Sequence, residues 1–367
     1  MIWNFVLRNM SAGNRCINHR RRRRARRRIF DALLLTISAA VLTAGCTGTG
    51  RTGAGEDPSV STESSGSMSK DGRISVVTTI FPPYDFVREI AGDEVNLTML
   101  LKPGEETHSY EPTPQDIIDI QNSDVFIYTG GENDVWVEDI LSSMPESDML
   151  TLRLTDCVDT VEEEEVEGMK GSGGHSHAHE TEDPQEEEES VHEIDEHVWT
   201  SPVNASLIVE HIKDVLSQAD PSGSELYAEN ALAYQEKLVD LDRQFRNIAD
   251  NAKRDVMIFG DRFPFRYFAD EYGLEYYAAF PGCAGDTEPS AATMVFLIEK
   301  VREENVPAVL KMELSNDDIA NAVAEATGTE VKVFYSCHNL SADDFESGET
   351  YLSMMQKNVE TLKEVLN

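Results

Sequence analysis

Apolar runs rich in β-branched residues alternate with segments of helical period along the first half of the chain. The runs predict buried strands and the segments predict helices, one of which has Thr113 as its N-cap and Pro114 in its first position. The expected strands are residues 73–80, 94–101 and 124–130, and the expected helices are residues 81–92, 113–123 and 134–144. Strands that alternate with helices indicate a parallel sheet of the α/β class.

The alternation restarts after a long, mostly polar helix expected at residues 222–252. The apolar residues of that helix recur with a roughly helical period, and they are Leu226, Ala233, Leu238, Leu241, Phe245 and Ile248. Beyond the helix, strands are expected at residues 255–260, 274–280, 307–313 and 330–336, and helices at residues 265–273, 289–304, 317–327 and from about 350.

This pattern predicts an α/β protein of two lobes, each with a mainly parallel sheet, joined by one long α-helix. The expected boundaries are residues 73–221 for the N-terminal lobe, 222–252 for the connecting helix and 253–367 for the C-terminal lobe. Ligands of parallel sheets bind beyond the carboxyl ends of the strands, so the site is expected in the cleft between the lobes.

Residues 1–45 have the composition of a signal peptide. A block of arginines precedes an apolar run that is too short for a comfortable membrane span and that closes on LTAGC. This ending resembles a bacterial lipobox, in which the cysteine, here Cys46, is lipidated and begins the mature chain, although Thr43 replaces the usual aliphatic residue. Cleavage near Ala44 with Cys46 as a free thiol is the alternative, and the long basic region is also compatible with a start at Met10.

Residues 46–72 follow the cysteine and are rich in glycine, serine and threonine, which predicts a flexible stalk. A lipid on Cys46 followed by a stalk predicts a globular body anchored to the cell membrane on its extracytoplasmic side.

The formal net charge is −37, from 68 acidic and 31 basic residues, and acidic residues are densest at 156–196. Such charge repels a phosphate backbone, which argues against a nucleic-acid partner and suits cation capture. Residues 156–196 have almost no apolar side chains, so we expect them to form a long mobile loop inserted in the first lobe. The histidines expected to collect metal weakly in this loop, unless it is only a solvated segment, are His175, His177, His179 and His192.

Three histidines stand outside that tract at places suited to ligands. His108 and His338 follow predicted strands, and His197 lies where apolar residues resume after the acidic loop. Asp261 ends the predicted strand 255–260. Three imidazoles and one carboxylate form a shell that zinc accepts in tetrahedral geometry, whereas more carboxylates would favour manganese.

The sequence DEHVW provides supports for the imidazole of His197. Val198 and Trp199 are expected to hold its backbone, and Asp195 or Glu196 can orient its ring, as metal-binding histidines generally require.

Three cysteines follow the stalk, at Cys157, Cys283 and Cys337. A disulfide between Cys283 and Cys337 is one expectation, because an oxidising compartment permits it, but the sequence does not fix the pairing. No CxxC pair is present, which disfavours a structural zinc site built from cysteines.

Four ordered motifs carry a family resemblance from about residue 74 to the end of the chain. They are IFPPYDFVREIAG, LLKPGEETHSYEPTPQD, DEHVWTSPVNA and the long helix before FADEYGL. Together they resemble the metal-binding, zinc/manganese-type solute-binding lipoproteins of bacterial ABC transporters. The acidic, histidine-rich loop before the second ligand motif resembles the zinc-selective branch.

The resemblance implies two α/β lobes, a rigid connecting helix and a metal between the lobes with four ligand positions. His108 and His197 match the first two positions, and His338 matches the fourth, where the family usually has Asp or Glu. Arg262 stands at the third position, where it cannot bind a cation. Candidates for completing the shell are Asp261 and Glu288, and Arg262 is expected to pair with a carboxylate such as Glu313.

We therefore interpret the chain as a monomeric receptor, not an enzyme, that captures Zn²⁺ and delivers it to an ABC permease with its ATPase. A receptor of the same family for Mn²⁺ or Fe²⁺ is the alternative. Two alternatives come from other classes: a zinc-dependent hydrolase with an open coordination position, and a surface adhesin (a cell-adhesion function) or passive metal buffer.

Overall fold

The structure is a computed structural model that describes residues 72–106, 110–145, 147–169, 194–284 and 288–367. It has two four-stranded sheets, and every strand pair in both is parallel, as the α/β alternation predicted. Among the residues described, no helix combines the length and the hydropathy that crossing a membrane requires.

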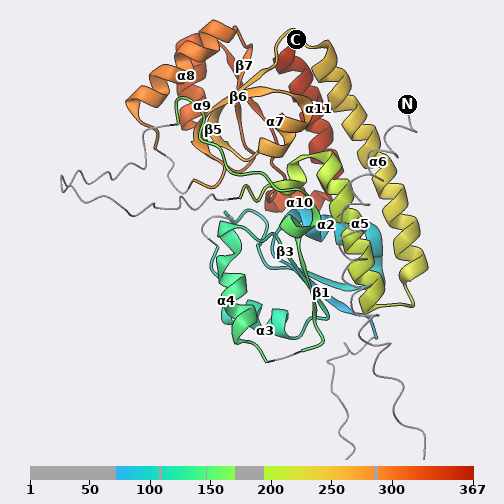
Figure 1. Ribbon diagram of the computed structural model, residues 1–367. Coiled ribbons are helices and arrows are strands. Elements are labelled where there is room, and N and C mark those ends of the chain that lie inside the picture. Colours follow the sequence, from blue (N-terminus) through green and yellow to red (C-terminus); the bar gives the residue numbers. More distant parts are fainter. Residues whose placement is uncertain (1–71, 107–109, 146, 170–193, 285–287) are drawn as a thin grey trace, which may run out of the picture. The chain divides into compact units, whose positions relative to one another are not determined.

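The first sheet has the strand order β2-β1-β3-β4 (Figure 1). Its strands are β1 (Ser75–Thr78), β2 (Asn96–Met99), β3 (Val125–Tyr128) and β4 (Leu150–Arg153). Its helices are α2 (Phe81–Ala91), α3 (Pro114–Gln121) and α4 (Val135–Ser143), with 3₁₀ turns η1 (Gly92–Glu94), η3 (Glu132–Asp134) and η4 (Leu154–Cys157). Thr113 caps α3 in a capping box with Asp116, which confirms the predicted start of that helix. Strand β4 was not predicted, because it is a four-residue edge strand of only partly buried residues.

The second sheet has the strand order β6-β5-β7-β8. Its strands are β5 (Val256–Phe263), β6 (Glu275–Pro281), β7 (Ala308–Lys311) and β8 (Glu330–Val333). Its helices are α7 (Arg266–Tyr272), α8 (Ala291–Glu304) and α9 (Asp318–Thr327), and the chain ends with α10 (Ala342–Ser347), which lies beside α2, and α11 (Tyr351–Leu366). Every residue of β5 is buried, so its carboxyl end brings polar side chains into the interior of the protein.

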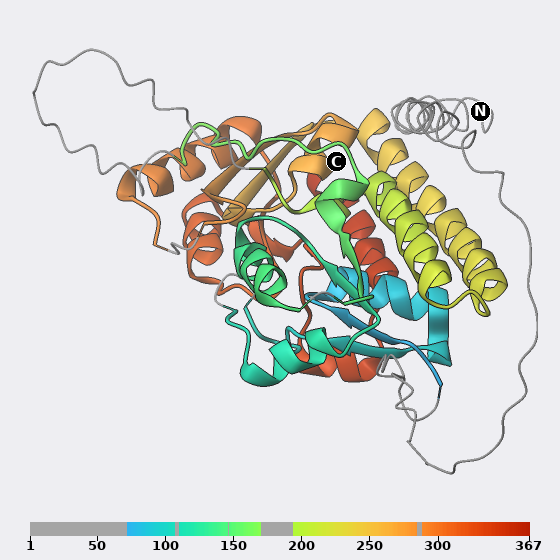
Figure 2. The ribbon, with the colours of Figure 1, turned by 60° about the horizontal axis from the view of Figure 1, so that its bottom comes forward.

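Two helices connect the sheets: α5 (Pro202–Ala219), which follows the 3₁₀ turn η5 (Val198–Thr200), and α6 (Ser224–Asn251). Figures 1 and 2 show α6 beside α5 and, further along, beside α11. The buried face of α6 differs from the predicted one at two positions, because Leu226 and Ala233 are exposed and Tyr227 and Tyr234 are buried instead. The two large tyrosine rings bury more apolar surface on that face than the residues predicted for it.

The acidic segment is not a loop of the first lobe along its whole length. Residues 158–169, here called the acidic strap, pack against elements of the second sheet (Figure 1). The backbone N–H of Val161 donates to the hydroxyl of Tyr267 at 3.2 Å, Glu164 pairs with Arg266, and Met169 is buried. The expected mobile loop of 156–196 is therefore wrong for its first part, because these carboxylates find cationic and hydroxyl partners on the second lobe.

The chain after β8 returns to the first lobe. The N–H of Phe81 donates to the carbonyl of His338 at 3.4 Å, and the N–H of Gly104 donates to the carbonyl of Leu340 at 2.8 Å. The N–H of Tyr351, at the start of α11, donates to the buried carboxylate of Asp85 at 2.7 Å. These bonds fix the C-terminal segment, and with it His338, against the first lobe.

Candidate metal centre

His197 lies at the start of η5 with its side chain fully buried. Its Nδ1 is 2.9 Å from Oδ1 of Asp195, and the same carboxylate oxygen accepts the backbone N–H of His197 at 2.8 Å. Asp195 is itself fixed, since its carbonyl accepts the hydroxyl of Tyr267 at 2.7 Å. A ring held at Nδ1 presents Nε2 for coordination, which confirms Asp195 as the orienting residue.

The electrostatic surroundings of His197 are strongly acidic. Burial alone would lower the pKa of its imidazole, but the negative charges of Asp195, Glu196 and Glu163 outweigh burial and raise it. The same charges attract a divalent cation to this place.

His338 lies next to His197, although 141 residues separate them in the sequence. The two rings meet edge to face with centroids 5.1 Å apart, and the ring of Trp199 packs on both. The indole N–H of Trp199 donates to the carbonyl of Ser336 at 2.9 Å, which attaches the His338 loop to η5. The structure thus brings two of the three predicted imidazoles together, one from each side of the connecting helix.

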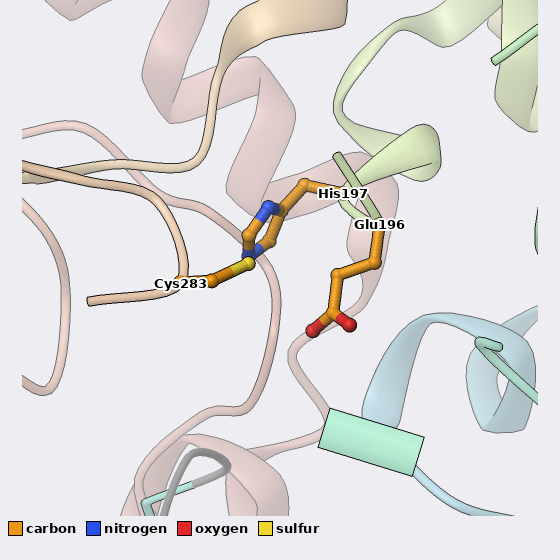
Figure 3. Close-up of side chains that lie close together, drawn as sticks. All are labelled: Glu196, His197 and Cys283. Atoms are coloured by element: carbon orange, nitrogen blue, oxygen red, sulfur yellow. The ribbon is translucent and has the colours of Figure 1, made fainter. Parts of the chain in front are cut away.

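A second set of donors surrounds His197 more closely. Figure 3 shows the sulfur of Cys283 against the ring of His197 and the side chain of Glu196 beside that ring. One ligand atom from each of these three residues lies within 4.8 Å of the other two. Glu196 was expected only as an orienting residue and Cys283 only as a disulfide partner, so sequence reasoning missed both as donors. The signal available was the place of Cys283 just beyond an apolar strand, which here is β6.

Asp261 does not join this cluster. Its Oδ2 accepts the backbone N–H of Met312 at 2.8 Å and the hydroxyl of Ser315, and its Oδ1 accepts the N–H of Arg262 at 2.8 Å. Asp261 therefore joins the ends of β5 and β7. A role of Asp261 as a metal ligand stays a prediction.

Arg262 pairs with Glu106 and not with Glu313. Its Nη2 lies 2.7 Å from Oε1 of Glu106 in the first lobe. Glu313 accepts the N–H of Ser336 at 2.8 Å and its hydroxyl at 2.9 Å, and burial raises the pKa of Glu313 to about 7. Glu313 therefore supports the His338 loop, whereas Glu288, the other proposed additional ligand, is exposed and lies outside the donor cluster.

A small cavity of about 30 Å³ adjoins His338. Carboxylates dominate its polar lining, which comprises Glu105, Glu106, Glu313, Ser336, His338 and Asn339 among others. The cavity has room for a water or an ion and continues the acidic character of the site.

The disulfide considered between Cys283 and Cys337 is not formed, because all three described cysteines are free thiols. Cys337 is fully buried with its sulfur 3.9 Å from the carbonyl of Tyr335, whereas Cys283 lies beside His197 and Glu196. The two thiols therefore occupy different environments.

Several predicted site residues lie outside the described residues, and nothing in the structure bears on them. They are Cys46, His108, His175, His177, His179 and His192.

Two parallel α/β sheets joined by a long helix, with histidines from both halves meeting beside a carboxylate cluster, define a two-lobed metal-binding protein of the solute-binding class. The chain belongs to the ZnuA family, described as the periplasmic component A of the zinc-uptake complex, whose sequence profile matches residues 76–365.

Individual relatives agree with this assignment. The chain is 34% identical over 294 residues to the zinc-binding lipoprotein AdcA of Streptococcus pneumoniae, a match that covers 80% of this chain and 56% of AdcA. It is 31% identical over 301 residues to the high-affinity zinc uptake system protein ZnuA of Bacillus subtilis, covering 81% of this chain and 89% of that protein. The Zn(II)-bound ZnuA-like domain of S. pneumoniae AdcA superposes with a TM-score of 0.64 at 31% identity, over 80% of this chain and 99% of the domain. The chain thus spans about half the length of the AdcA proteins it matches.

Proposed function

We propose that this protein is an extracytoplasmic receptor that binds Zn²⁺ between its lobes and delivers it to an ABC permease. The observation that carries the proposal is the buried pair of His197 and His338, whose rings lie 5.1 Å apart although they come from different lobes. A cation held by both residues makes the position of the His338 loop against η5 depend on occupancy, which a permease can sense.

Zinc is the favoured cargo for two reasons. Imidazole donors suit zinc better than manganese, which prefers oxygen ligands. The relatives named above are zinc-binding or zinc-uptake proteins, and the matched domain of AdcA was solved with Zn(II) bound. His108, which matches the family's first ligand, completes the proposed set on the first lobe.

The receptor performs no chemistry on its cargo. We propose that Cys46 carries the lipid that anchors the chain to the membrane, with residues 47–72 as the stalk that lets the body reach the permease. This arrangement follows from the sequence of the first 72 residues. Replacing Cys46 with serine should release the mature protein from the membrane fraction, and a variant that stays membrane-bound would contradict the anchor.

Metal content and calorimetric titration of the purified protein test the central proposal. We expect one tight Zn²⁺ per chain, with zinc outcompeting Mn²⁺ and Fe²⁺, and we expect His197→Ala and His338→Ala to weaken binding at least about 100-fold. His211→Ala is the matched control, because His211 is exposed on α5 and should leave affinity unchanged. Tight manganese binding with weak zinc binding would reverse the assignment of cargo, and equal affinities in all three variants would contradict the site.

A further inference from the structure

We propose that Cys283 is a thiolate ligand of the bound metal, together with His197 and Glu196, and that this sulfur sets the preference of the site for zinc over manganese. The proposal rests on the proposed function, because it assumes that the cleft binds a divalent cation. Arg262 stands at the third ligand position that the family resemblance implies. We propose that Cys283, from a different loop, supplies the missing donor.

The three donors are close enough to converge on one ion. Zinc bonds of about 2.0–2.3 Å in a tetrahedral shell separate neighbouring ligand atoms by roughly 3.3–3.8 Å. The ligand atoms of Glu196, His197 and Cys283 lie within 4.8 Å of one another, so shortening their separations by at most about 1.5 Å brings them to that geometry. Figure 3 shows that the sulfur and the carboxylate approach the imidazole from different elements of the chain.

The second lobe offers few other donors here. The guanidinium of Arg262 has only hydrogen-bond donors, so it offers no ligand atom to a cation, and Glu106 holds it. The oxygens of Asp261 accept two backbone N–H groups and a hydroxyl. Of the side chains near His197 that the structure describes, Cys283 is the donor from the second lobe that falls within the cluster.

The loop after β6 is built to hold Cys283 against His197. A Cβ atom on Gly282 would lie 3.1 Å from Cε1 of His197, so the glycine lets the loop backbone approach the ring closely. The N–H of Cys283 donates to Oε1 of Glu163 at 2.9 Å, which ties the loop to the acidic strap. Two separate segments thus position the thiol.

The acidic surroundings fit a metal ligand better than a nucleophile. Asp195, His197 and Cys283 place a carboxylate, an imidazole and a thiol next to one another, as in a thiol hydrolase, but a nucleophilic thiol needs a lowered pKa. Burial and the charges of Glu196 and Glu163 instead raise the pKa of Cys283. A metal binds the thiolate form of cysteine, so the S–H proton passes to solvent as the sulfur–metal bond forms.

Cobalt(II) titration of the full mature protein tests this directly, because Co²⁺ bound to a thiolate has a charge-transfer absorption in the near ultraviolet that imidazole and carboxylate ligands do not give. We expect one equivalent of Co²⁺ to produce this band, zinc to abolish it by displacement, and Cys283→Ser to lack it. We also expect Cys283→Ser to lose about 100-fold in zinc affinity while manganese affinity changes by only a few fold. Cys157→Ala is the matched control, since Cys157 is a free thiol outside the donor cluster and its replacement should keep the band.

Alkylation of the wild-type protein gives a second readout that does not depend on a variant folding. Because the raised pKa of Cys283 leaves little thiolate, peptide mapping after prolonged iodoacetamide treatment should show Cys283 modified slowly in the metal-free protein and protected by one equivalent of zinc. Binding of one Co²⁺ without the band, or zinc binding that leaves Cys283 open to alkylation, would overturn the thiolate ligand alone. Absence of any stoichiometric zinc or cobalt binding would instead overturn the proposed function.

Discussion

Arg262 and Glu106 form an ion pair, with Nη2 2.7 Å from Oε1, that joins the end of β5 to the loop after β2. The guanidinium is only 9% exposed, whereas the carboxylate is 43% exposed. The enclosed guanidinium depends on the carboxylate of Glu106, because a buried charge without a partner lowers the stability of the fold. The pair therefore links the two lobes.

Glu106→Gln should lower the free energy of unfolding by about 1–2 kcal/mol, since it leaves the enclosed guanidinium facing a neutral amide and the partner is only half-buried. Urea denaturation of the metal-free protein measures the loss. Glu105→Gln is the control, because Glu105 pairs with the exposed Lys102 at 3.9 Å and such surface pairs contribute little. Equal losses in the two variants would show that the pair does not join the lobes energetically.

The sequence predicted the two lobes because their strands and helices repeat clear hydrophobic patterns. It also placed His197 and His338 correctly relative to these elements, since the carboxyl ends of parallel strands face a common cleft. The direct contact of the two rings depends on the topology, and Trp199, whose ring packs on both, was already expected to hold the backbone of His197.

Other features depend on contacts that no local pattern encodes. The acidic strap has the composition of a disordered loop, yet Glu164 and Val161 bind Arg266 and Tyr267 about a hundred residues away. A cysteine of an exported protein commonly either forms a disulfide or binds a metal. For Cys283, only its position beside His197 distinguishes the two roles. The partner of Arg262 could not be chosen from the sequence either, because many carboxylates lie near strand ends.

Gly131→Ala should weaken metal binding without removing a donor. Gly131 has an extended backbone that alanine can adopt, but an added Cβ would collide with the Cβ and carboxylate of Glu196. We expect Glu196 to turn away and zinc affinity to fall about 10–100-fold, as when a supporting residue of a metal site is lost. Calorimetric titration measures the change.

The matched control for that substitution is Gly260→Ala. Its Cβ would meet the backbone of Ala320 at 2.6 Å, so the variant should lose stability through β5 and α9 while keeping its zinc affinity. A Gly131→Ala protein that binds zinc normally would remove Glu196 from the ligand set.

Asp134 makes stability depend on pH. Burial raises its pKa to about 7, although its Oδ2 accepts the N–H groups of Thr129 at 2.6 Å and Gly130 at 3.1 Å. Because the folded state favours the protonated form of Asp134, this group contributes its full stabilisation below the unfolded pKa of 3.8. The stabilisation is lost as the pH rises through the folded pKa of about 7. The metal-free protein should therefore become less stable between pH 4 and pH 8.

Asp134→Asn should flatten that dependence, because the amide oxygen still accepts both N–H groups and carries no charge. Each unit of pKa difference corresponds to about 1.4 kcal/mol, so the stability of the variant relative to wild type should rise by roughly 1–4 kcal/mol across this range. Denaturation at several pH values measures it, with Asp139→Asn on the exposed face of α4 as the control. Parallel curves for Asp134→Asn and wild type would contradict the assignment.

The acidic segment should divide into a part that supports the tight site and a part that does not. Residues 158–169 reach the donor loop through Glu163 and Cys283, whereas the histidines at 175–192 are expected to bind metal only weakly. Replacing residues 171–192 with a Gly/Ser linker of about ten residues should keep one tight zinc and lower the total metal bound.

A deletion that begins at residue 160 should behave differently, because it also removes the bond between Glu163 and Cys283 and the contact of Val161 with Tyr267. We expect its tight site to weaken by about 10-fold or more, in the range seen when outer partners of a metal site are lost. Titration of both deletions with zinc separates the two roles. If the shorter deletion abolished tight binding, the weak histidines would have to belong to the main site. If the longer one left it unchanged, the strap would have no part in holding Cys283.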